Sequence, residues 1–488
     1  MEEGTIFGHG RRKVALVYPS PYPVAMSSLG FQAVYGDLNA IADTSAERAF
    51  LPDADDAPHG ALCTYESGRP AGDFPVVAFS VAYELEIGGI FSCLQRMGIA
   101  LLRRDRSPTA PFVVMGGPLT FSNPAPLGPF ADVVVMGEAE ELLAPLLDVL
   151  FSGMSKEACL QALAERAGFY VPHVHGDVPP PVAQCRDALL PAASVVRTPD
   201  TALANMHLVE TERGCSRGCT FCVMRRSTNG GMRVVPMERI LATIPEGATR
   251  VGLVGAAVSD HPRIVQIARS IVDSGRDIGL SSLRSDRLTE EFVAVLMRGG
   301  YRTLTVASDG ASERLRIGMQ KKIRARHLLR AAELARDAGM AVLKVYMMIG
   351  APDETDEDID ELIAFTKEQA RVAGHKTRVA LGIAPFVAKR NTPLAGYPFL
   401  GVKRVQRRLE RVRRGLMPQV TVRPTSARWA WVEHALAQGG AAVGMAALEA
   451  WRQGGGFSAW KAALGALGVV PDASSAPQFP LLVGEMVG

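Results

Sequence analysis

Three cysteines in one short segment, Cys215, Cys219 and Cys222, constrain this chain more than any other feature of its sequence. Their C-x3-C-x2-C spacing allows three thiolates to hold three irons of a [4Fe–4S] cube and leaves the fourth iron without a protein ligand. An iron with an open position can bind a small chelating molecule and pass it an electron, which a site with four cysteine ligands cannot do. A disulfide pair, half a zinc site or buried thiols are the simpler interpretations. The spacing fits no C-x2-C…C-x2-C zinc pattern, however, and no fourth Cys or His lies nearby, so a cluster is favoured.

An aromatic residue, Phe221, stands just before the last cysteine, and Glu212-Arg213-Gly214 precedes the first. This run resembles the signature of the radical S-adenosylmethionine (SAM) enzymes. The resemblance implies that Cys215, Cys219 and Cys222 are the catalytic and metal-binding residues and that Phe221 lies beside SAM. It also implies the chemistry, in which the reduced cluster passes an electron to SAM. The 5′-deoxyadenosyl radical that results takes a hydrogen from an unactivated C–H bond.

The composition indicates a large core and no extreme charge. The 488 residues are enough for two or three domains, 48% of them are hydrophobic, and the net charge of +3 is too small to argue for nucleic acid by itself. The other four cysteines are scattered, which favours a reducing cytoplasm over a disulfide framework. No basic-then-apolar leader is evident, and no run of about 18 apolar residues could span a bilayer. We expect a soluble, cytoplasmic protein.

Residues 1–155 alternate short apolar runs with amphipathic stretches. The runs at 13–18, 76–81, 112–115 and 133–136 are typical of buried strands, and the stretches between them are typical of helices. This pattern predicts an α/β domain with a parallel sheet covered by helices. Ligands of such sheets bind where loops leave the carboxyl ends of the strands. The candidate binding residues in those loops are Ser80, Gly116, Gly117, Gly137 and Glu138.

Several segments of this region resemble the cobalamin-binding-domain radical SAM proteins, whose first domain is similar to the flavodoxin-like cobalamin module. The matching segments are residues 17–19, 26–30, 65–70, 79–84 and 116–118. The resemblance implies a cobalamin held by the five loop residues just named. The module's first loop usually has D-x-H-x-x-G, whose His coordinates cobalt, whereas residues 20–30 contain no His. Either cobalamin binds without that ligand, or bulky residues such as Tyr22, Met26 and Phe121 fill the pocket.

Residues 156–200 are expected to form a linker, and residues 201–400 contain regular β/α units. Strands are expected at 206–210, 250–254, 277–281, 303–306, 342–348 and 378–383, with helices after most of them. Six such units indicate the partial (β/α)6 barrel of radical SAM enzymes. In parallel barrels the chemistry takes place at the carboxyl ends of the strands, and the cysteine segment leaves the first strand there.

The ends of the other strands carry the candidate SAM contacts. Those that the resemblance implies are Gly255, Ser282, Arg284, Asp309, Glu313 and Gly350. Arg284 can hold the SAM carboxylate in a bidentate fork. Two turns depart from the family pattern. Gly255-Ala256-Ala257 stands where a G-G-E-like turn binds the methionyl amine, and Asp309 stands where the family has Glu.

Residues 401–488 are expected to form a small helical extension. Within it, residues 403–414 predict a helix with one apolar and one basic face. A basic face can attract a phosphate-rich partner such as RNA, although it is more often a solvated surface.

The sequence leaves three functions open. The first is cobalamin-dependent C-methylation of an unknown substrate by a radical SAM enzyme, with a reducing partner such as flavodoxin or ferredoxin. The second is a cobalamin-free radical SAM enzyme that modifies RNA, because the core also resembles the methylthiotransferases. Those enzymes carry three more cluster cysteines in their first domain, which Cys63 and Cys93 do not supply. The third is a non-enzymatic iron–sulfur binding or regulatory protein.

Overall fold

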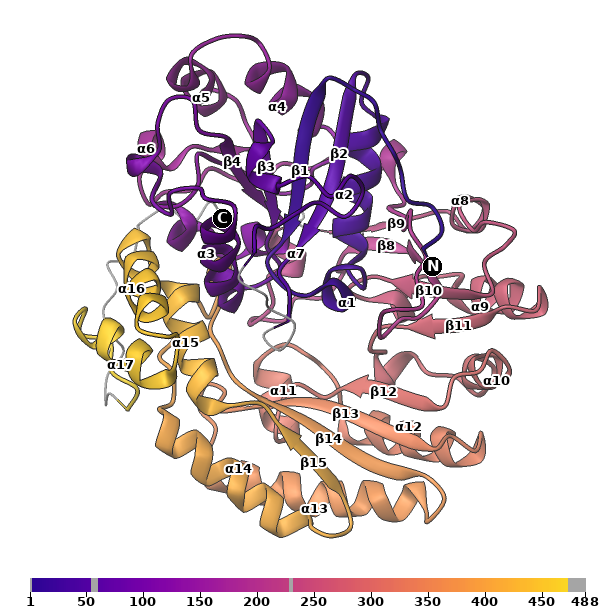
Figure 1. Ribbon diagram of the computed structural model, residues 1–488. Coiled ribbons are helices and arrows are strands. Elements are labelled where there is room, and N and C mark those ends of the chain that lie inside the picture. The colour runs from indigo at the N-terminus through magenta and orange to yellow at the C-terminus, as the bar shows by residue number, and fades with distance from the viewer. Residues whose placement is uncertain (1, 54–59, 228–230, 473–488) are drawn as a thin grey trace.

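The computed structural model describes residues 2–53, 60–227 and 231–472 (Figure 1). Residues 473–488, which the sequence assigns to the helical extension, lie outside the described residues. Figure 1 shows an N-terminal α/β part in indigo and purple next to a second part in rose and orange. The C-terminal helices, in yellow, lie along one side of both.

The first part is built on a six-stranded sheet with the strand order β2-β1-β3-β4-β5-β6. All neighbouring strands are parallel except β5 and β6. The strands are β1 (Arg12–Tyr18), β2 (Thr44–Phe50), β3 (Val76–Ser80), β4 (Phe112–Gly116), β5 (Val133–Val135) and β6 (Phe169–Tyr170). The order of the first five strands is that of flavodoxin-like folds, in which ligands bind at the switch point between β1 and β3. The parallel α/β sheet expected from the sequence is therefore confirmed.

Helices cover both faces of this sheet. They are α1 (Tyr22–Ala25), α2 (Leu29–Ala40), α3 (Ile87–Arg96), α4 (Leu143–Leu150), α5 (Lys156–Ala164) and α6 (Pro172–His175). Successive residues of a strand point to opposite faces, so β1 contributes to two cores. Val14 and Leu16 pack with α2 and α4, whereas Ala15 and Val17 belong to the core that includes α3 and the second part. The segment expected to be a linker contains α5, β6 and α6, and so adds an antiparallel edge strand to the sheet.

The second part contains seven parallel strands in two sheets, β11-β10-β7 and β12-β13-β14-β15. The strands are β7 (Met206–Glu210), β10 (Arg250–Val254), β11 (Asp277–Leu280), β12 (Thr303–Ala307), β13 (Val342–Ile349), β14 (Arg378–Pro385) and β15 (Thr421–Pro424). A parallel bridge between Leu283 and Val306 joins the two sheets. All six strands expected from the sequence are present. β15 is a seventh, formed by a segment that the sequence assigned to the helical extension.

Helices connect most of these strands. They are α7 (Met224–Ser227), α8 (Met237–Ala242), α9 (Ile264–Asp273), α10 (Glu290–Arg298), α11 (Glu313–Gly318), α12 (Ala325–Asp337) and α13 (Asp356–Ala373). Local signals set the bounds of α13. Thr355 and Asp358 form a capping box at its start, and Gly374, with φ of +72°, ends it.

One face of β13 is partly exposed. On β13, Val345 and Met347 are buried in the core, whereas Tyr346 points to the other face and is 39% exposed. The Nζ of Lys344, on the same face, lies 4.5 Å from the centroid of the Tyr346 ring. Polar and aromatic side chains therefore line part of this face.

The C-terminal helices bind both larger parts. They are α14 (Val402–Leu416), α15 (Ala427–Gln438), α16 (Ala441–Arg452) and α17 (Phe457–Gly465). The side-chain amide of Asn123, from the first part, donates to three backbone carbonyls at the end of α15, at 2.7–3.2 Å. Trp451 of α16 donates its Nε1–H to the hydroxyl of Ser92 in α3, at 3.1 Å. Across the described residues, no helix has the length and apolar character needed to cross a bilayer.

Candidate active site

The cysteine segment lies at the carboxyl end of β7, as the sequence predicts. It begins from a two-stranded antiparallel ribbon, in which β8 (Glu212–Gly214) pairs with β9 (Met232–Val234). Gly214 has φ of +85°, a conformation that glycine adopts without strain, and it directs the chain into the loop. The far side of the loop rests on the turn after α11, where the N–H of Thr220 donates to the carbonyl of Met319 at 3.0 Å.

The three thiols lie close enough to interact electrostatically, but they are not all within 4.8 Å of one another. A single tetrahedral zinc ion, with Zn–S bonds of about 2.3 Å, needs sulfurs about 3.8 Å apart. The spacing therefore suits the separate irons of a cluster better than one shared ion. Burial raises the pKa of both Cys219 and Cys222, and the neighbouring cysteines raise it further. Thiolates form here when cations such as cluster irons compensate them.

Asp309, an expected SAM contact, lies beside Cys219 in an ion pair with Lys321. The Lys321 Nζ is 2.5 Å from Asp309 Oδ2. Lys321 lowers the pKa of Cys219 and Cys222, while Asp309 raises that of Cys219, so both charges act on the cysteine loop. Asp309 has φ of +62°, which turns the chain sharply at the end of β12.

Arg284, the expected carboxylate partner of SAM, is buried and connected to the cysteine loop through Asp260. Its Nη2 donates to Asp286 at 3.0 Å, and its Nε lies 3.6 Å from Asp260 without a hydrogen-bond partner among the described residues. Asp260 also accepts from the Nε of Arg217, in the cysteine loop, at 2.9 Å. A buried Nε–H without a partner is a donor that a ligand carboxylate can satisfy. Ser282, two residues earlier, is exposed.

Gly255 lies against the carboxylate of Glu212. A Cβ at Gly255 would lie 1.9 Å from Glu212 Oε2, so a side chain at position 255 would displace the carboxylate. Glu212 accepts the N–H of Ala257 at 2.5 Å and the hydroxyl of Thr211 at 2.7 Å. Burial raises the pKa of Glu212 to about 7, and nearby carboxylates contribute to the rise. The turn after β10 is thus held by a carboxylate from the base of the cysteine loop.

Three other expected SAM contacts have protein partners. Glu313 accepts the N–H of Ala325, at the start of α12, at 2.6 Å. Gly350 has φ of +85°, a conformation that favours glycine, and its N–H donates to Glu354 at 2.8 Å. Phe221 is partly buried against the core. Glu313, Gly350 and Phe221 stay predicted SAM contacts, and Arg284 and Asp309 are the expected contacts that the structure connects to the cysteine loop.

A cavity of about 250 Å³ lies in the first part, between the sheet, α2 and α4. The residues expected to bind cobalamin, Ser80, Gly116, Gly117, Gly137 and Glu138, all line it. Gly117 and Gly137 have φ of +104° and +98°, and a Cβ at either would lie within 2.7 Å of a neighbouring backbone oxygen. Glycine is therefore required at both positions for these loops to pack as they do.

The cavity reaches the cysteine loop from both sides. Arg213, two residues before Cys215, and Met224, two residues after Cys222, are among its lining residues. A ligand that fills this cavity would therefore reach residues on both flanks of the cysteine segment.

The bulky residues of the first loop do not fill this space. Tyr22 packs against Phe50, with 5.1 Å between ring centroids, and the Met26 sulfur lies 3.4 Å from Nη1 of Arg48. Neither Tyr22 nor Met26 lines the cavity, and Phe121 is one part of its wall. No histidine is among the lining residues.

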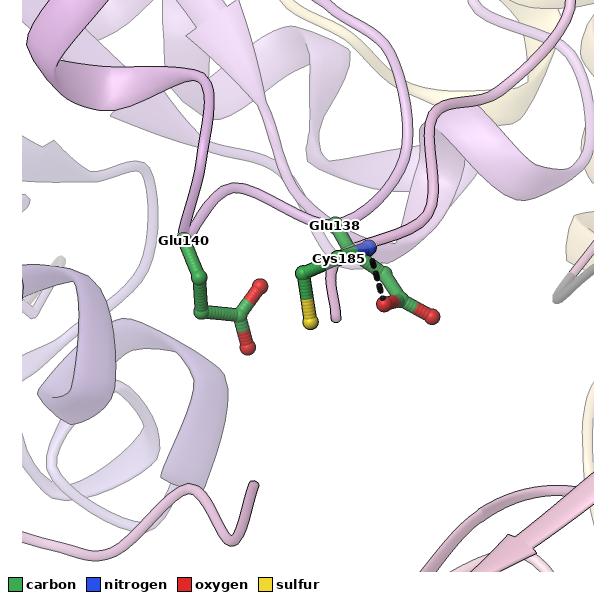
Figure 2. Close-up of side chains that lie close together, drawn as sticks. All are labelled: Glu138, Glu140 and Cys185. Atoms are coloured by element: carbon green, nitrogen blue, oxygen red, sulfur yellow. Dashed lines mark hydrogen bonds between the residues drawn. The ribbon is translucent and has the colours of Figure 1, made fainter. Parts of the chain in front are cut away.

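Glu138, Glu140 and Cys185 come together at the edge of the cavity, each offering a ligand atom within 4.8 Å of the others (Figure 2). They are spaced like metal ligands, but the Arg213 guanidinium lies among them. Its Nη1 is 2.7 Å from Glu140, 3.3 Å from Glu138 and 3.5 Å from the Cys185 sulfur. A cation thus already occupies the position that an ion would take. Arg213 instead ties the cysteine loop to the loop after β5.

Comparison with known families identifies the class of the protein. The sequence model described as "Radical SAM proteins, N-terminal" matches residues 30–172, and that of the "Radical SAM superfamily" matches residues 209–366. The second match includes all three cysteines and the strands from β10 to β13. The chain belongs to the radical SAM superfamily and is a radical SAM enzyme, whose chemistry uses a [4Fe–4S] cluster and SAM. The resemblance seen in the sequence is confirmed, and the non-enzymatic alternative is set aside.

Individual relatives agree with this class. The chain is 27% identical over 390 residues to the uncharacterized protein MJ0966 of Methanocaldococcus jannaschii, which covers 78% of each chain. It is 28% identical over 271 residues to the uncharacterized methyltransferase PH0819 of Pyrococcus horikoshii, covering 53% of this chain and 58% of that one. Among solved structures, the radical SAM methyltransferase TsrM from Kitasatospora setae, with cobalamin and a [4Fe–4S] cluster bound, matches with a TM-score of 0.58. The match covers 93% of this chain and 99% of TsrM at 15% identity, which shows a shared fold.

Sequence reasoning missed three residues of the site, Glu212, Arg213 and Lys321. The first two directly precede the cysteine loop, and charged side chains between a buried strand and a metal loop were the available signal. Lys321 gave no such signal, because it reaches the cysteines only through the packing of the loop on the turn after α11.

Proposed function

We propose that this radical SAM enzyme transfers a methyl group to a carbon of its substrate with the help of cobalamin. The observation that carries the proposal is the cavity of the first part, which is lined by glycine loops and bordered by both ends of the cysteine loop. The names of PH0819 and TsrM, both methyltransferases, support the same reaction class.

Cys215, Cys219 and Cys222 hold the cluster in this proposal. When bound, the cluster supplies an electron to SAM and the corrin supplies a carrier for the methyl group. Lys321 and Arg217 bring positive charge to the loop, which offsets the negative charge of three thiolates. A protein of the flavodoxin or ferredoxin class is the electron source that such a cluster requires.

The SAM site lies on the cysteine side of the strand ends. Arg284 offers its unpaired Nε–H to the methionyl carboxylate, and its hydrogen bond to Asp286 holds the guanidinium in place. Asp309 has one oxygen on Lys321, and its second oxygen is an acceptor for a hydroxyl or amine of SAM. The substrate reaches the same region along the partly exposed face of β13, where Tyr346 and Lys344 lie.

The first part is suited to cobalamin by shape and polarity. Its cavity is mainly apolar and can take the aromatic base of the cofactor's nucleotide tail, while the glycine loops leave room for the corrin. The sheet places this site at the carboxyl ends of its strands, where flavodoxin-like folds bind ligands. No histidine is among the residues that line this cavity, so its lining would hold the cofactor through shape and hydrogen bonds and not through a bond to cobalt.

Gly30 offers a direct test of corrin binding. It is the second residue of α2, it lines the cavity, and an added Cβ would meet nothing within 4 Å. Gly30→Trp therefore places a large side chain in the cavity without a backbone clash. We expect the wild-type protein, reconstituted anaerobically with hydroxocobalamin and then desalted, to keep the absorption and EPR spectra of a corrin, and Gly30→Trp to lose them.

Gly465→Trp is the matched control. Gly465 is also a helical glycine, and an added Cβ there would meet nothing within 4 Å. It lies in α17 and is not among the residues that line the cavity. This variant should retain corrin like the wild type. All three proteins should keep the brown cluster chromophore. A wild-type protein that carries its cluster but retains no corrin would contradict the proposal and leave a cobalamin-free radical SAM enzyme.

A further inference from the structure

Glu212 is a buried carboxylate at the mouth of the barrel that lacks a cationic partner. It is 1% exposed, and its hydrogen bonds come from the backbone of Ala257 and the hydroxyl of Thr211. Among the described residues, no arginine or lysine forms an ion pair with it. Carboxylates taken out of water are normally paired, because an uncompensated buried charge is costly.

The carboxylates around Glu212 show the usual arrangement. Glu210 is paired with Arg213 at 2.7 Å, and Asp260 is paired with Arg217 at 2.9 Å. Both negative charges also raise the pKa of Glu212, which is to say that they oppose its ionisation. Glu212 is thus the carboxylate of this group that is ready to accept a cation from outside the protein.

The position of Glu212 indicates which cation. Its carboxylate occupies the space beside Gly255, in the turn after β10, where residues 255–257 supply no acidic side chain. Arg284 follows β11, the strand that pairs with β10, and its Nε lies 3.6 Å from Asp260, which belongs to the turn after β10. The site therefore offers an unpaired carboxylate and an unpaired guanidinium N–H on neighbouring strand ends. An α-amino acid, with its ammonium and carboxylate on one carbon, has the complementary pair of charges.

We infer that Glu212 binds the α-ammonium group of SAM and so supplies from the base of the cysteine loop the acidic side chain that the turn after β10 lacks. Glu212 precedes Cys215 by three residues, so the same short segment carries both this contact and the first cluster ligand. The inference rests on the SAM chemistry of the superfamily and not on corrin binding. The corrin experiment with Gly30 can therefore fail while this inference stands.

Glu212→Gln removes the charge and keeps the size and a hydrogen-bonding oxygen. In anaerobically reconstituted protein, we expect the dissociation constant for SAM to rise about 10- to 100-fold, the range for loss of a hydrogen bond to a charged group. Decarboxylated SAM keeps the amine and should lose affinity by the same factor. 5′-Deoxy-5′-methylthioadenosine lacks the amino-acid part and should bind both proteins equally. The cluster spectrum should not change.

Glu47→Gln is the matched control. Glu47 is also buried, it accepts from the Thr64 hydroxyl at 2.7 Å, and it lies on the edge strand β2 and not among the residues that line the cavity. SAM binding should be unaffected in this variant. Unchanged SAM affinity in Glu212→Gln, or an equal loss for methylthioadenosine, would overturn the inference. If the wild-type protein did not bind SAM, the assignment of SAM chemistry itself would be contradicted.

Discussion

Single residues around the cysteines are arranged so that charge is balanced in pairs before a ligand arrives. Lys321 faces Asp309, Arg217 faces Asp260, and Arg213 is shared by several carboxylates. Glu212 is the exception, because burial and neighbouring carboxylates raise its pKa from the ordinary value of about 4.5 to about 7. A buried carboxylate that has no cationic partner until SAM binds is expected to reduce the stability of the SAM-free protein.

The pH dependence of stability tests whether Glu212 destabilises the SAM-free protein. The folded protein holds a proton on Glu212 up to about pH 7, whereas the unfolded chain releases it near pH 4.5, so the folded state binds more protons in this window. Stability from this group therefore falls as pH rises from 4.5 through 7. Glu212→Gln removes the effect and should stabilise the SAM-free protein by about 1 kcal/mol at pH 5 and about 3 kcal/mol at pH 8. Thermal midpoints of reconstituted protein at the two pH values measure it.

A purely structural Glu212 would give the opposite sign. If its hydrogen bonds to Ala257 and Thr211 served mainly to hold the turn, the variant would be less stable at both pH values. Gain of stability together with loss of SAM affinity is the combination that a ligand-binding role requires.

At this scale the sequence identified the cysteine segment and the glycine loops that line the cavity, whereas the residues expected to bind SAM stay predictions. The cysteine spacing is local, and glycines after strands are recognisable because parallel strands end at one edge. The contact of Glu212 with Gly255 joins positions more than forty residues apart and leaves no local pattern. Glu313 and Gly350 were chosen by resemblance, and their own hydrogen-bond partners became visible only in the folded structure.

At the scale of elements, helix ends and strand edges decide how the parts meet. The basic face of α14 is partly used inside the molecule, because Arg408 pairs with Glu354 at 2.6 Å and Arg411 with Asp360 at 2.6 Å. Glu354 also accepts the N–H of Gly350 at 2.8 Å, so the turn after β13 is fastened to α14. These contacts give the arginines a structural use that needs no nucleic acid.

Asn123 is the side chain that closes α15. The last carbonyls of a helix have no partner within it, and the amide of Asn123 satisfies three backbone carbonyls here at 2.7–3.2 Å. Asn123→Ala leaves them buried and unpaired, which should lower the free energy of unfolding by about 2–4 kcal/mol. Gln161→Ala removes an amide from an exposed position of α5, where it bonds only the Glu165 side chain, and should change it by less than about 0.5 kcal/mol. Equal thermal midpoints for the two variants would show that the amide of Asn123 does not hold α15.

The six longer strands of the barrel could be predicted from the sequence, whereas β15 could not. The six expected strands are apolar runs, and periodicity identifies them because their side chains are mostly buried. β15 has four residues, three of them exposed, and includes Arg423 and Pro424. It pairs with β14 at the edge of the sheet, so the pairing depends on tertiary contacts that composition does not reveal.

At the scale of the whole molecule, charged contacts fix the first part against the barrel. Arg213 joins the cysteine loop to the loop after β5 on one side. On another side, Lys389, which follows β14, lies 2.7 Å from Glu84 of the first part and 2.8 Å from Glu433 of α15. One ammonium thus connects all three parts of the chain. Burial by itself would lower the pKa of Lys389, but the two carboxylates raise it overall, so the charge is kept.

Lys389→Met tests whether this contact holds the parts together. The variant leaves the buried Glu84 without its cation, and because Lys389 is partly exposed we expect a loss of about 2 kcal/mol, below the range for fully buried pairs. Hydrogen exchange should quicken in the loop after β3 and in α15, while the central barrel strands stay protected. Adding Glu84→Gln removes the unpaired charge and should restore most of the stability.

Lys367→Met, at an exposed position of α13, is the control and should behave like the wild type. If Lys389→Met matched that control in both measurements, the relative position of the two parts would depend on Arg213 and the apolar contacts of α15 and α16 instead.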